Sequence, residues 1–513
     1  MNFPVWQLGF PGGLLIAIVA VTHVFISHFA VGGGAFLVLS ERRAYLRNDE
    51  ALLSYVRRHS KFFALLTLVY GAISGVGIWF TIGLVAPEAT FSLIRTFMWA
   101  WAIEWVFFFV EITAAIIYYS QWDRLDRSTH MAIGWIYFVA AWMSLFVING
   151  IITYQLTPGR WLITHNVWDG LFNPTYWPSL FLRTSMSILL AGVFGMLTAM
   201  RERDEVRDRI NRWAGQWMII GALFLPGFAW WYYSRFPDFS RALLNGTLPA
   251  AQHPIRMGML SAALILLIGL TCAIWKPRAM RSPIVAVLVF LAFSLMASGE
   301  YLREFVRKPW VINGYIYSNG LRVTDLPQYQ QAGFTHEPKF ISTDDLSSAE
   351  YGHDLFVSQC GSCHTVDGYR AMRKRVVGWD PTFAKEMLAH IHLLRGTMPQ
   401  FAGNEQDRVA LGKYLSSLNP AVNFAGVSDR TVAGKQSFDA RCSHCHTING
   451  NLRPLKAAFE GGGPDQVQAL LPALDSMSPN MPPFTGTPEE AQLLAEYIAS
   501  MSNAQAATAK GGK

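Results

Sequence analysis

Long apolar runs, confined to the first 306 residues of a 513-residue chain, limit the fold more than any other feature. A helix needs about 20 apolar residues to cross the core of a bilayer, and lipid favours helices because each helix bonds its own backbone. Eight stretches have this character, near 13–39, 62–86, 96–120, 131–156, 177–200, 213–233, 255–275 and 283–306. We therefore predict an all-α, polytopic membrane bundle of eight or so transmembrane helices over residues 1–312.

The loops between these runs predict the orientation of the bundle. Loops after the first, third, fifth and seventh runs hold most of the Arg and Lys, and such loops stay in the cytoplasm. Eight crossings then place both the N-terminus and the C-terminal domains in the periplasm of a bacterial cytoplasmic (inner) membrane. The net charge of +7 fits these loops, so we expect membrane lipid and no nucleic acid as a partner.

Two copies of Cys-x-x-Cys-His lie in the polar C-terminal part, in "SQCGSCHTV" and "ARCSHCHTI". This pattern is the attachment signal of c-type haem: the thiols bind the vinyl groups and the imidazole binds the iron. A zinc or redox site is the alternative, which the trailing His in both copies disfavours. The sequence therefore predicts two covalent haem c groups, held by Cys360, Cys363 and His364 and by Cys442, Cys445 and His446.

An internal repeat gives both motifs the same surroundings. The first cysteines are 82 residues apart, and Met398 in "GTMPQF" and Met481 in "PNMPPF" are 83 apart. A thioether opposite imidazole raises the reduction potential of haem iron, so these methionines are the expected sixth ligands. Met477 is a weaker candidate because it lacks the Pro directly after it and the Phe three residues on that both other methionines have. We predict a linker over 313–345, two small α-helical cytochrome c domains over 346–424 and 425–505, and a disordered tail over 506–513.

Ionisable side chains inside the apolar runs are costly in lipid and are candidates for function. His23 lies in the first run, and Glu104 and Glu111 lie in the third. Seven residues make about two helical turns, so both carboxylates are expected on one face. A haem with one axial His beside a proton-carrying carboxylate suits these residues. Hydrogen-bonded core side chains are the alternative.

Three segments in order resemble subunit I of cytochrome bd-type quinol oxidases: "VTHVFISHFAVGGGAFLVLSE", "AIEWVFFFVEITAAIIYYSQWDRL" and "EFVRKPW". The resemblance covers roughly residues 10–315. It implies that His23 is an axial ligand of a high-spin haem and that the membrane part holds one or two haems of b or d type. It also implies catalytic or proton-carrying roles for Glu104, Glu111, Glu304 and Arg307, and haem contacts for Arg256 and Trp310.

The chain departs from this family where quinol would deliver electrons. The positions that match the ligands of the low-spin haem hold Arg183 and Gly258. A ligand position of the second high-spin haem holds Ala297, with Glu300 one turn later as a substitute. The quinol-binding loop is reduced to about twenty residues. We therefore expect the haem c domains to replace quinol as the electron entry to a buried haem that reduces oxygen.

Three other functions stay open on the sequence alone. The membrane part can conduct electrons between the quinone pool and periplasmic carriers, with His165 and His253 as ligands or quinol contacts. The same buried haem can reduce nitric oxide, or the chain can be a non-catalytic subunit of a respiratory complex. The expected partners are a periplasmic electron donor or acceptor and a second bd-like membrane subunit.

Overall fold

The computed structural model describes residues 8–246, 248–334, 345–450, 453–478 and 481–503. The chain divides into two compact units, one built mainly from residues 15–307 and the other mainly from residues 315–513. Helices dominate both, which confirms the all-α prediction. In the described residues the only strands are the short pair β1 (Trp310–Ile312) and β2 (Ile316–Tyr317). Residues 335–344 of the predicted linker and the predicted tail lie outside the described residues.

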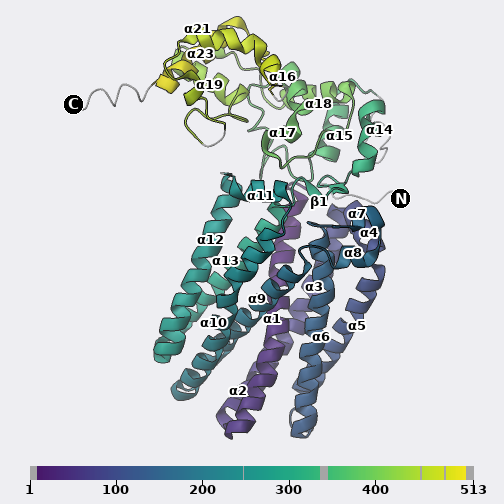
Figure 1. The fold of residues 1–513 in the computed structure, drawn as a ribbon, viewed down its shortest axis with the longest axis vertical. Helices are drawn as coiled ribbons and strands as arrows, with labels where there is room; N and C mark the ends of the chain where they lie inside the picture. The colour runs from purple at the N-terminus through teal and green to yellow at the C-terminus, as the bar shows by residue number, and fades with distance from the viewer. Residues whose placement is uncertain (1–7, 247, 335–344, 451–452, 479–480, 504–513) are drawn as a thin grey trace, which may run out of the picture. The chain divides into compact units, whose positions relative to one another are not determined.

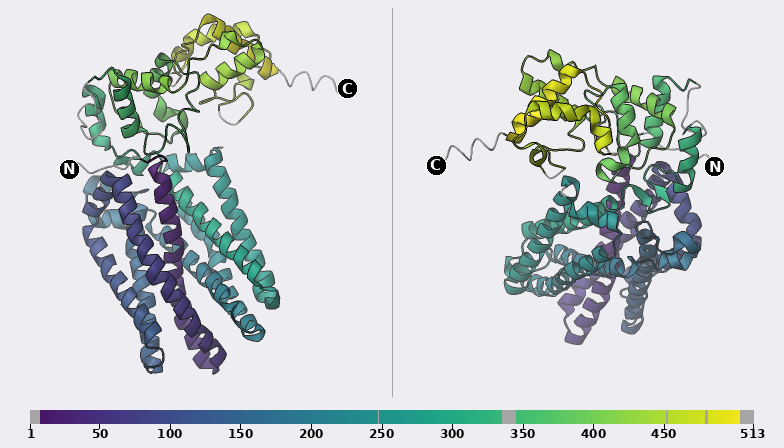
Figure 2. Two further views of the ribbon diagram at one scale, coloured as in Figure 1. Left: turned by 180° about the vertical axis from the view of Figure 1, so that it is seen from behind. Right: turned by 45° about the horizontal axis from the view of Figure 1, so that its top comes forward.

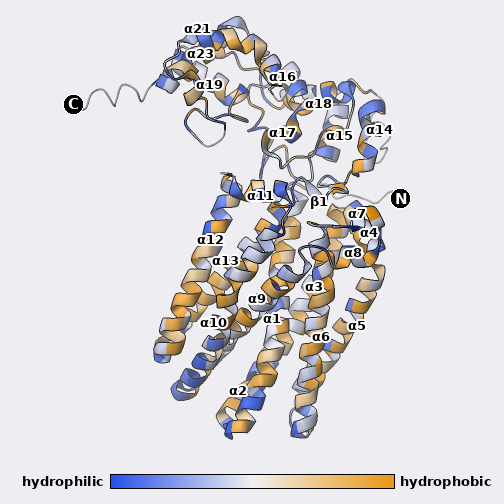
Figure 3. Cartoon of the chain, viewed as in Figure 1, coloured by the Kyte–Doolittle hydropathy of each residue, from blue (hydrophilic) through white to orange (hydrophobic). Residues whose placement is uncertain are grey.

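The first unit is a bundle of long helices, whose apolar surfaces run along most of their length (Figure 1, Figure 3). Exposed Trp105 and Phe109 on α5 are typical of a surface that faces lipid. The helices of this unit are α1 (Gly12–Arg47), α2 (Glu50–Ala64), α3 (Ala72–Val85), α4 (Pro87–Thr96), α5 (Met98–Ser120), α6 (Arg127–Tyr154), α7 (Trp161–Thr164), α8 (Val167–Leu171), α9 (Tyr176–Ala199), α10 (Asp204–Ser234), α11 (Asp238–Asn245), α12 (Pro249–Ile268) and α13 (Ser282–Phe305). Two π-helical segments, Leu65–Gly71 and Gly269–Trp275, continue α2 into α3 and extend α12.

Seven helical segments in the described chain are long and apolar enough to cross a membrane, one fewer than predicted. The difference is α10, which covers the predicted run 213–233. Its first half is charged, and its second half ends in "AWWYYS", whose Trp and Tyr are less hydrophobic than aliphatic residues. It nevertheless packs along α9: a Cβ on Gly221 would lie 2.4 Å from the backbone nitrogen of Leu189.

Small residues let α1 run through the middle of the bundle, between α2–α6 and α9–α13 (Figure 2). Three consecutive glycines, Gly32, Gly33 and Gly34, each face a different neighbour. A Cβ on Gly32 would lie 1.9 Å from the carbonyl oxygen of Ser187 on α9, and a Cβ on Gly34 would lie 2.4 Å from the ring of Tyr137 on α6. Close backbone approach at small residues is how helices pack in membranes.

The second unit contains two copies of one helical pattern. In each copy a helix before the Cys-x-x-Cys-His motif crosses a later helix: α15 crosses α18, and α19 crosses α23. The helices are α14 (Leu326–Ala332), α15 (Ala349–Gln359), α16 (Pro381–Ala389), α17 (Ile391–Arg395), α18 (Glu405–Ser417), α19 (Arg430–Arg441), α20 (Lys456–Phe459), α21 (Pro464–Leu470), α22 (Leu474–Met477) and α23 (Pro488–Asn503). We call the copy around α15 and α18 domain 1 and the copy around α19 and α23 domain 2.

Candidate functional site

Each Cys-x-x-Cys-His motif begins where a helix ends. Cys360 follows the last residue of α15, and Cys442 follows the last residue of α19. Each cysteine packs against the apolar core of its own domain, and burial raises the pKa of both thiols to about 12. Among the described residues, no group of three or more His, Cys, Asp or Glu side chains is placed to hold a metal ion.

The two motif histidines are held in the same way. Nδ1 of His364 lies 3.2 Å from the carbonyl oxygen of Arg370, and Nδ1 of His446 lies 3.0 Å from that of Arg453. A carbonyl only accepts, so Nδ1 carries the proton and Nε2 is left as the basic nitrogen. Burial lowers the pKa of both imidazoles, which keeps them neutral. A neutral imidazole with an oriented Nε2 fits an axial iron ligand.

In domain 1 a glutamine ties the methionine loop to the haem-attachment motif. The Gln359 side chain donates to the carbonyl of Ala402 (2.7 Å) and accepts from its N–H (2.9 Å). Gln359 directly precedes Cys360, and Ala402 lies four residues after Met398. These bonds hold the loop of Met398 beside the first cysteine, as a sixth ligand requires.

Domain 2 uses an arginine for the same purpose. Arg441 directly precedes Cys442 and donates to the hydroxyl of Thr485 (3.1 Å), four residues after Met481. Arg441 also pairs with buried Glu490 at 3.0 Å. The weaker candidate, Met477, lies on α22 and is 55% exposed. The equivalent tether therefore favours Met481.

A serine hydroxyl orients the imidazole of His23 in the membrane unit. Its Nδ1 lies 3.0 Å from the hydroxyl of Ser74 on α3, and that hydroxyl donates to the carbonyl of Tyr70 at 2.6 Å. Because the single hydroxyl proton is used, Nδ1 of His23 donates to Ser74 and Nε2 is the basic nitrogen. Gly75 faces the ring, since a Cβ there would lie 3.2 Å from it.

His28 on the same helix is engaged differently. Its Nδ1 bonds to the carbonyl of Val24 at 2.7 Å, and its Nε2 faces the guanidinium of Arg183 at 3.5 Å. Arg183 is paired with Glu300 at 3.1 Å, and Glu300 with Arg303 at 2.8 Å. This buried ion network occupies Nε2 of His28 and both oxygens of Glu300, so neither side chain is prepared to bind iron. Glu300 therefore does not fit the substitute-ligand prediction.

The positions that match the low-spin haem ligands do not fit such a haem. Arg183 is a cation in the network above, and Gly258 faces Ser298, 3.4 Å from where its Cβ would be. The neighbouring Met257 and Met259 are 46% and 68% exposed, so their thioethers turn away from the core.

Glu104 and Glu111 lie on the face of α5 that packs on α6, as their spacing predicts. Glu104 accepts a hydrogen bond from Ser144 at 2.8 Å, and Glu111 accepts one from Tyr137 at 3.0 Å. The two donors are also seven residues apart, on α6. Both carboxylates are thus held in one line along the α5–α6 interface.

The charged residues at the end of α13 form a second group. Arg307 bonds to Glu304 and to the side chain of Gln155 at the end of α6. Arg303, on the same helix, is paired with Glu300 at 2.8 Å. The arrangement ties the end of α13 to the end of α6.

Four further predicted residues lie apart from these groups. Arg256, His165 and His253 are exposed side chains of the membrane unit. Trp310 belongs to the second unit, where its ring stacks on Tyr317 with centroids 4.2 Å apart. No hydrogen bond or stacking contact in the described chain joins these four to His23, Glu104 or Glu111.

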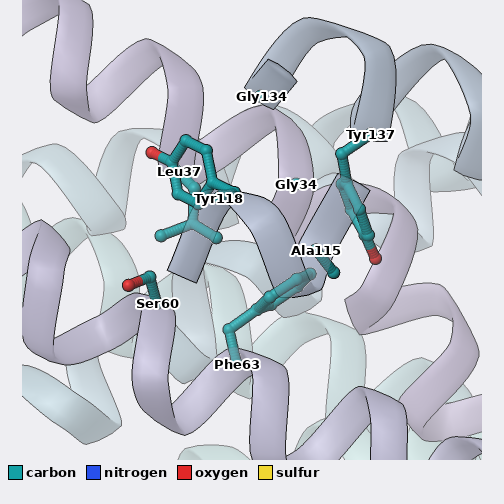
Figure 4. Close-up of a pocket in the computed structure, with 8 residues that line it drawn as sticks. All are labelled: Gly34, Leu37, Ser60, Phe63, Ala115, Tyr118, Gly134 and Tyr137. Atoms are coloured by element: carbon teal, nitrogen blue, oxygen red, sulfur yellow. The ribbon is translucent and has the colours of Figure 1, made fainter. Parts of the chain in front are cut away.

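A buried carboxylate cluster was missed by the sequence analysis. Glu41 accepts from Tyr118 at 2.6 Å and contacts Nδ1 of His130 at 2.8 Å, and all three side chains are buried. Tyr118 also lines a cavity of about 10 Å³ with Gly34, Leu37, Ser60, Phe63, Ala115, Gly134 and Tyr137 (Figure 4). Glu41 ends the first segment that carries the family resemblance, but His130 was assigned to a loop and the cluster was not predicted.

Comparison with known families assigns both parts of the chain. Residues 14–233 match the model of "Cytochrome bd terminal oxidase subunit I", and residues 347–415 and 429–498 match that of "Cytochrome C oxidase, cbb3-type, subunit III". The chain joins a bd subunit I domain to two cytochrome c domains. This confirms the resemblance and indicates a multi-pass, haem-bearing respiratory oxidoreductase. No curated protein matches the chain.

The fold of the bd domain also matches a solved structure. The bd oxidase from Geobacillus thermodenitrificans superimposes with a TM-score of 0.52 at 14% identity. The match covers 59% of this chain and 88% of that chain. At this identity the match supports the fold of the bd domain and says nothing about its donor.

Proposed function

We propose that the protein is a terminal oxidase-like haem oxidoreductase that takes electrons through its own two haem c sites and reduces oxygen at a buried haem held by His23. The bound haems supply the redox chemistry, as one-electron carriers in the c domains and as the oxygen site in the bd domain. The protein's residues position these groups and deliver protons. The prepared Nε2 of His23 supports the ligand role.

The buried ion network of Arg183 is the observation that carries this proposal. It stands where the related family binds the low-spin haem that takes electrons from quinol, and it offers no ligand for iron. Both c sites, in contrast, have oriented imidazoles and tethered methionine loops. Electrons therefore enter by domain 2, pass to domain 1 and continue to the site of His23.

Glu104 and Glu111 are the proposed proton carriers, since oxygen reduction consumes protons with electrons. Glu111 is bonded to Tyr137, which lines the small cavity together with Tyr118, and Tyr118 is bonded to Glu41. A cavity of about 10 Å³ is near the size that holds one water. These groups form a route by which protons reach the carboxylates. Glu304 and Arg307 tie the end of α13 to the end of α6.

The proposed setting is the bacterial cytoplasmic membrane, with the N-terminus and the c domains in the periplasm. This orientation needs α10 as an eighth crossing, which its packing along α9 supports. The partners are a periplasmic electron donor and a second bd-like membrane subunit, since the matched family is named as one subunit of an oxidase.

A carbon monoxide difference spectrum of the reduced protein tests the oxygen site. We expect a CO-reactive haem in the wild type, its loss in His23→Ala, and its retention in the matched control His28→Gln, because His28 is held by Arg183. Both c haems should stay in all three proteins. A CO signal that survives in His23→Ala would remove His23 as the ligand. Its absence from the wild type would favour electron conduction or a non-catalytic role.

Oxygen uptake then identifies the donor. We expect uptake with a soluble reductant of c-type haem and at least tenfold slower uptake with a quinol, because the Arg183 network blocks the quinol-linked site. Faster uptake with quinol would overturn the proposed entry. Nitric oxide consumption without oxygen uptake would reassign the substrate.

A further inference from the structure

Three consecutive residues of domain 1, Gly378, Trp379 and Asp380, each contact domain 2. Gly378 has φ +77, and a Cβ there would lie 2.7 Å from the ring of Phe424 and 3.0 Å from Ala440 on α19. A side chain at this position is strained by its backbone angle and also has no room. The glycine therefore allows the backbone of domain 1 to touch domain 2.

Trp379 of domain 1 contacts the haem-attachment motif of domain 2. Its indole N–H donates to Nε2 of His444 at 3.3 Å, and the rings meet edge to face with centroids 5.3 Å apart. His444 lies between Cys442 and Cys445. On its other side Trp379 packs against the core of domain 1, which also contains Cys360.

Asp380 connects to both segments that frame the iron site of domain 2. One oxygen caps α16 by accepting from the N–H of Phe383 at 2.9 Å. The other accepts from Arg441 at 2.6 Å and from Thr485 at 2.9 Å. Arg441 precedes Cys442, and Thr485 follows Met481. The contact thus reaches the attachment motif and the methionine loop together.

The residues of domain 2 that make these contacts differ from the residues at the same positions of domain 1. The position of His444 is Ser362 in domain 1, and the position of Arg441 is Gln359, which bonds within its own domain. The side chains that meet at the contact are therefore absent from the common pattern of the two domains. His444 contacts domain 1 through Trp379, and Arg441 bonds both to Asp380 of domain 1 and to the methionine loop of its own domain.

We propose that Gly378–Asp380 is a docking segment that fixes the attachment motif of domain 2 against domain 1, and that Trp379 positions the two haems for direct electron exchange. The exchange moves one electron: one iron is oxidised, the other is reduced, and no bond is made or broken. The inference rests on the proposed function only in that both c sites hold haem.

Two measurements on the full-length, haem-loaded protein test the segment. Pulsed EPR of the oxidised protein reports the iron–iron distance between the c haems, and flash photoreduction reports the exchange rate. Gly378→Ala should broaden the distance distribution. Trp379→Ala should slow exchange at least tenfold, and Trp379→Phe, which keeps the ring in the core, should slow it less. Tyr369→Ala, an exposed aromatic of domain 1, is the control and should change neither.

Unchanged distance and exchange in both Gly378→Ala and Trp379→Ala would overturn the proposal. Protease cleavage between α18 and α19 gives a readout that needs no redox chemistry: it should be at least threefold faster in Gly378→Ala, and an unchanged rate would count against docking. A missing CO-reactive haem would defeat the proposed oxygen reduction and leave these readouts intact, so the two failures are distinguishable.

Discussion

The two c domains share one helix crossing and differ at its edge. In both, a glycine of the first helix sits against the backbone of the last helix, and a Cβ on Gly352 or Gly434 would lie 2.4 Å from a carbonyl oxygen there. The ring pairs above the crossing also match: their centroids are 5.8 and 5.7 Å apart and their planes differ by 48° and 51°, for Phe356–Tyr414 and Phe438–Tyr497. The shared residues are those that pack the two helices of each domain together.

The difference lies in the residue before the first cysteine. Gln359 bonds only to the methionine loop of domain 1, while Arg441 bonds to its own loop, to Glu490 and to Asp380 of the other domain. The neutral amide of Gln359 makes its hydrogen bonds within domain 1, whereas the guanidinium of Arg441 makes bonds in both domains. The comparison shows how the two copies differ at their contact: Arg441 of domain 2 forms an ion pair with Asp380 of domain 1, and Gln359 of domain 1 bonds to its own methionine loop.

Arg441→Gln is the substitution from which we expect the largest loss of stability, and it tests the difference between the two domains directly. Arg441 and Glu490 have side chains only 7% and 6% exposed, so the change leaves a buried carboxylate without its cation. Loss of one partner of a buried pair costs about 3–5 kcal/mol. We expect the free energy of unfolding of domain 2 to fall by this amount, measured by denaturant titration of the haem absorbance, with domain 1 unchanged.

Two control variants give stability losses against which the loss in Arg441→Gln can be compared. Gln359→Ala removes two neutral hydrogen bonds and should cost domain 1 about 1–3 kcal/mol. Arg430→Gln breaks an exposed ion pair with Glu496 and should cost domain 2 about 0–1 kcal/mol. Equal losses in all three variants would mean that Arg441 has no special role.

The methionines test whether the two iron sites are equivalent. Met398→His and Met481→His each replace a thioether by an imidazole, which should lower the reduction potential of one c haem by on the order of 100 mV, about 2.3 kcal/mol for one electron. A spectroelectrochemical titration should show one of two waves moving in each variant. Met477→Ala is the control, and a shift there instead of in Met481→His would reassign the ligand.

Much of this site follows from the sequence, because covalent haem attachment fixes the spacing of Cys360, Cys363 and His364 within one helical turn. Local patterns likewise predict the spans, since a helix in lipid needs a continuous apolar run. Ion pairs between residues that are far apart in the sequence cannot be predicted in this way. The residues around Arg441 do not indicate that it pairs with Asp380, and those around Glu300 do not indicate that it pairs with Arg183.

The difference between the eight predicted spans and the seven apolar helices has a related cause. Hydropathy describes one segment at a time, and α10 mixes a charged half with an aromatic end. Its place in the bundle depends on Gly221 fitting against α9, which is a property of two helices. The partners of Glu41 were not predicted for the same reason, since Tyr118 and His130 come from later helices.

The shared helix crossing gives a prediction of symmetry. Gly352→Ala and Gly434→Ala each force a methyl group against backbone, and overpacking of this kind costs about 1–3 kcal/mol. We expect equal losses, each confined to the domain that carries the change, in the same haem-absorbance titration. A loss in domain 2 from Gly352→Ala would show that the docking contact couples the two folds more tightly than the asymmetric ion pair implies.

The smallest expected effect is a pH dependence of the junction. Burial raises the pKa of Asp380, but bonds from the Phe383 N–H, Arg441 and Thr485 outweigh it, and the net result is a pKa below the ordinary value. A carboxylate with a lowered pKa stabilises the folded contact above its unfolded pKa of about 3.9, and this contribution is lost as pH falls through the lower folded value. The iron–iron distance distribution should therefore stay narrow from pH 7 to about 4 and broaden below it.

Asp380→Asn keeps the shape of the side chain and removes the titration, so its distribution should be slightly broader at pH 7 and change less below pH 4. A wild-type transition that persists unchanged in Asp380→Asn would assign the pH response to another group.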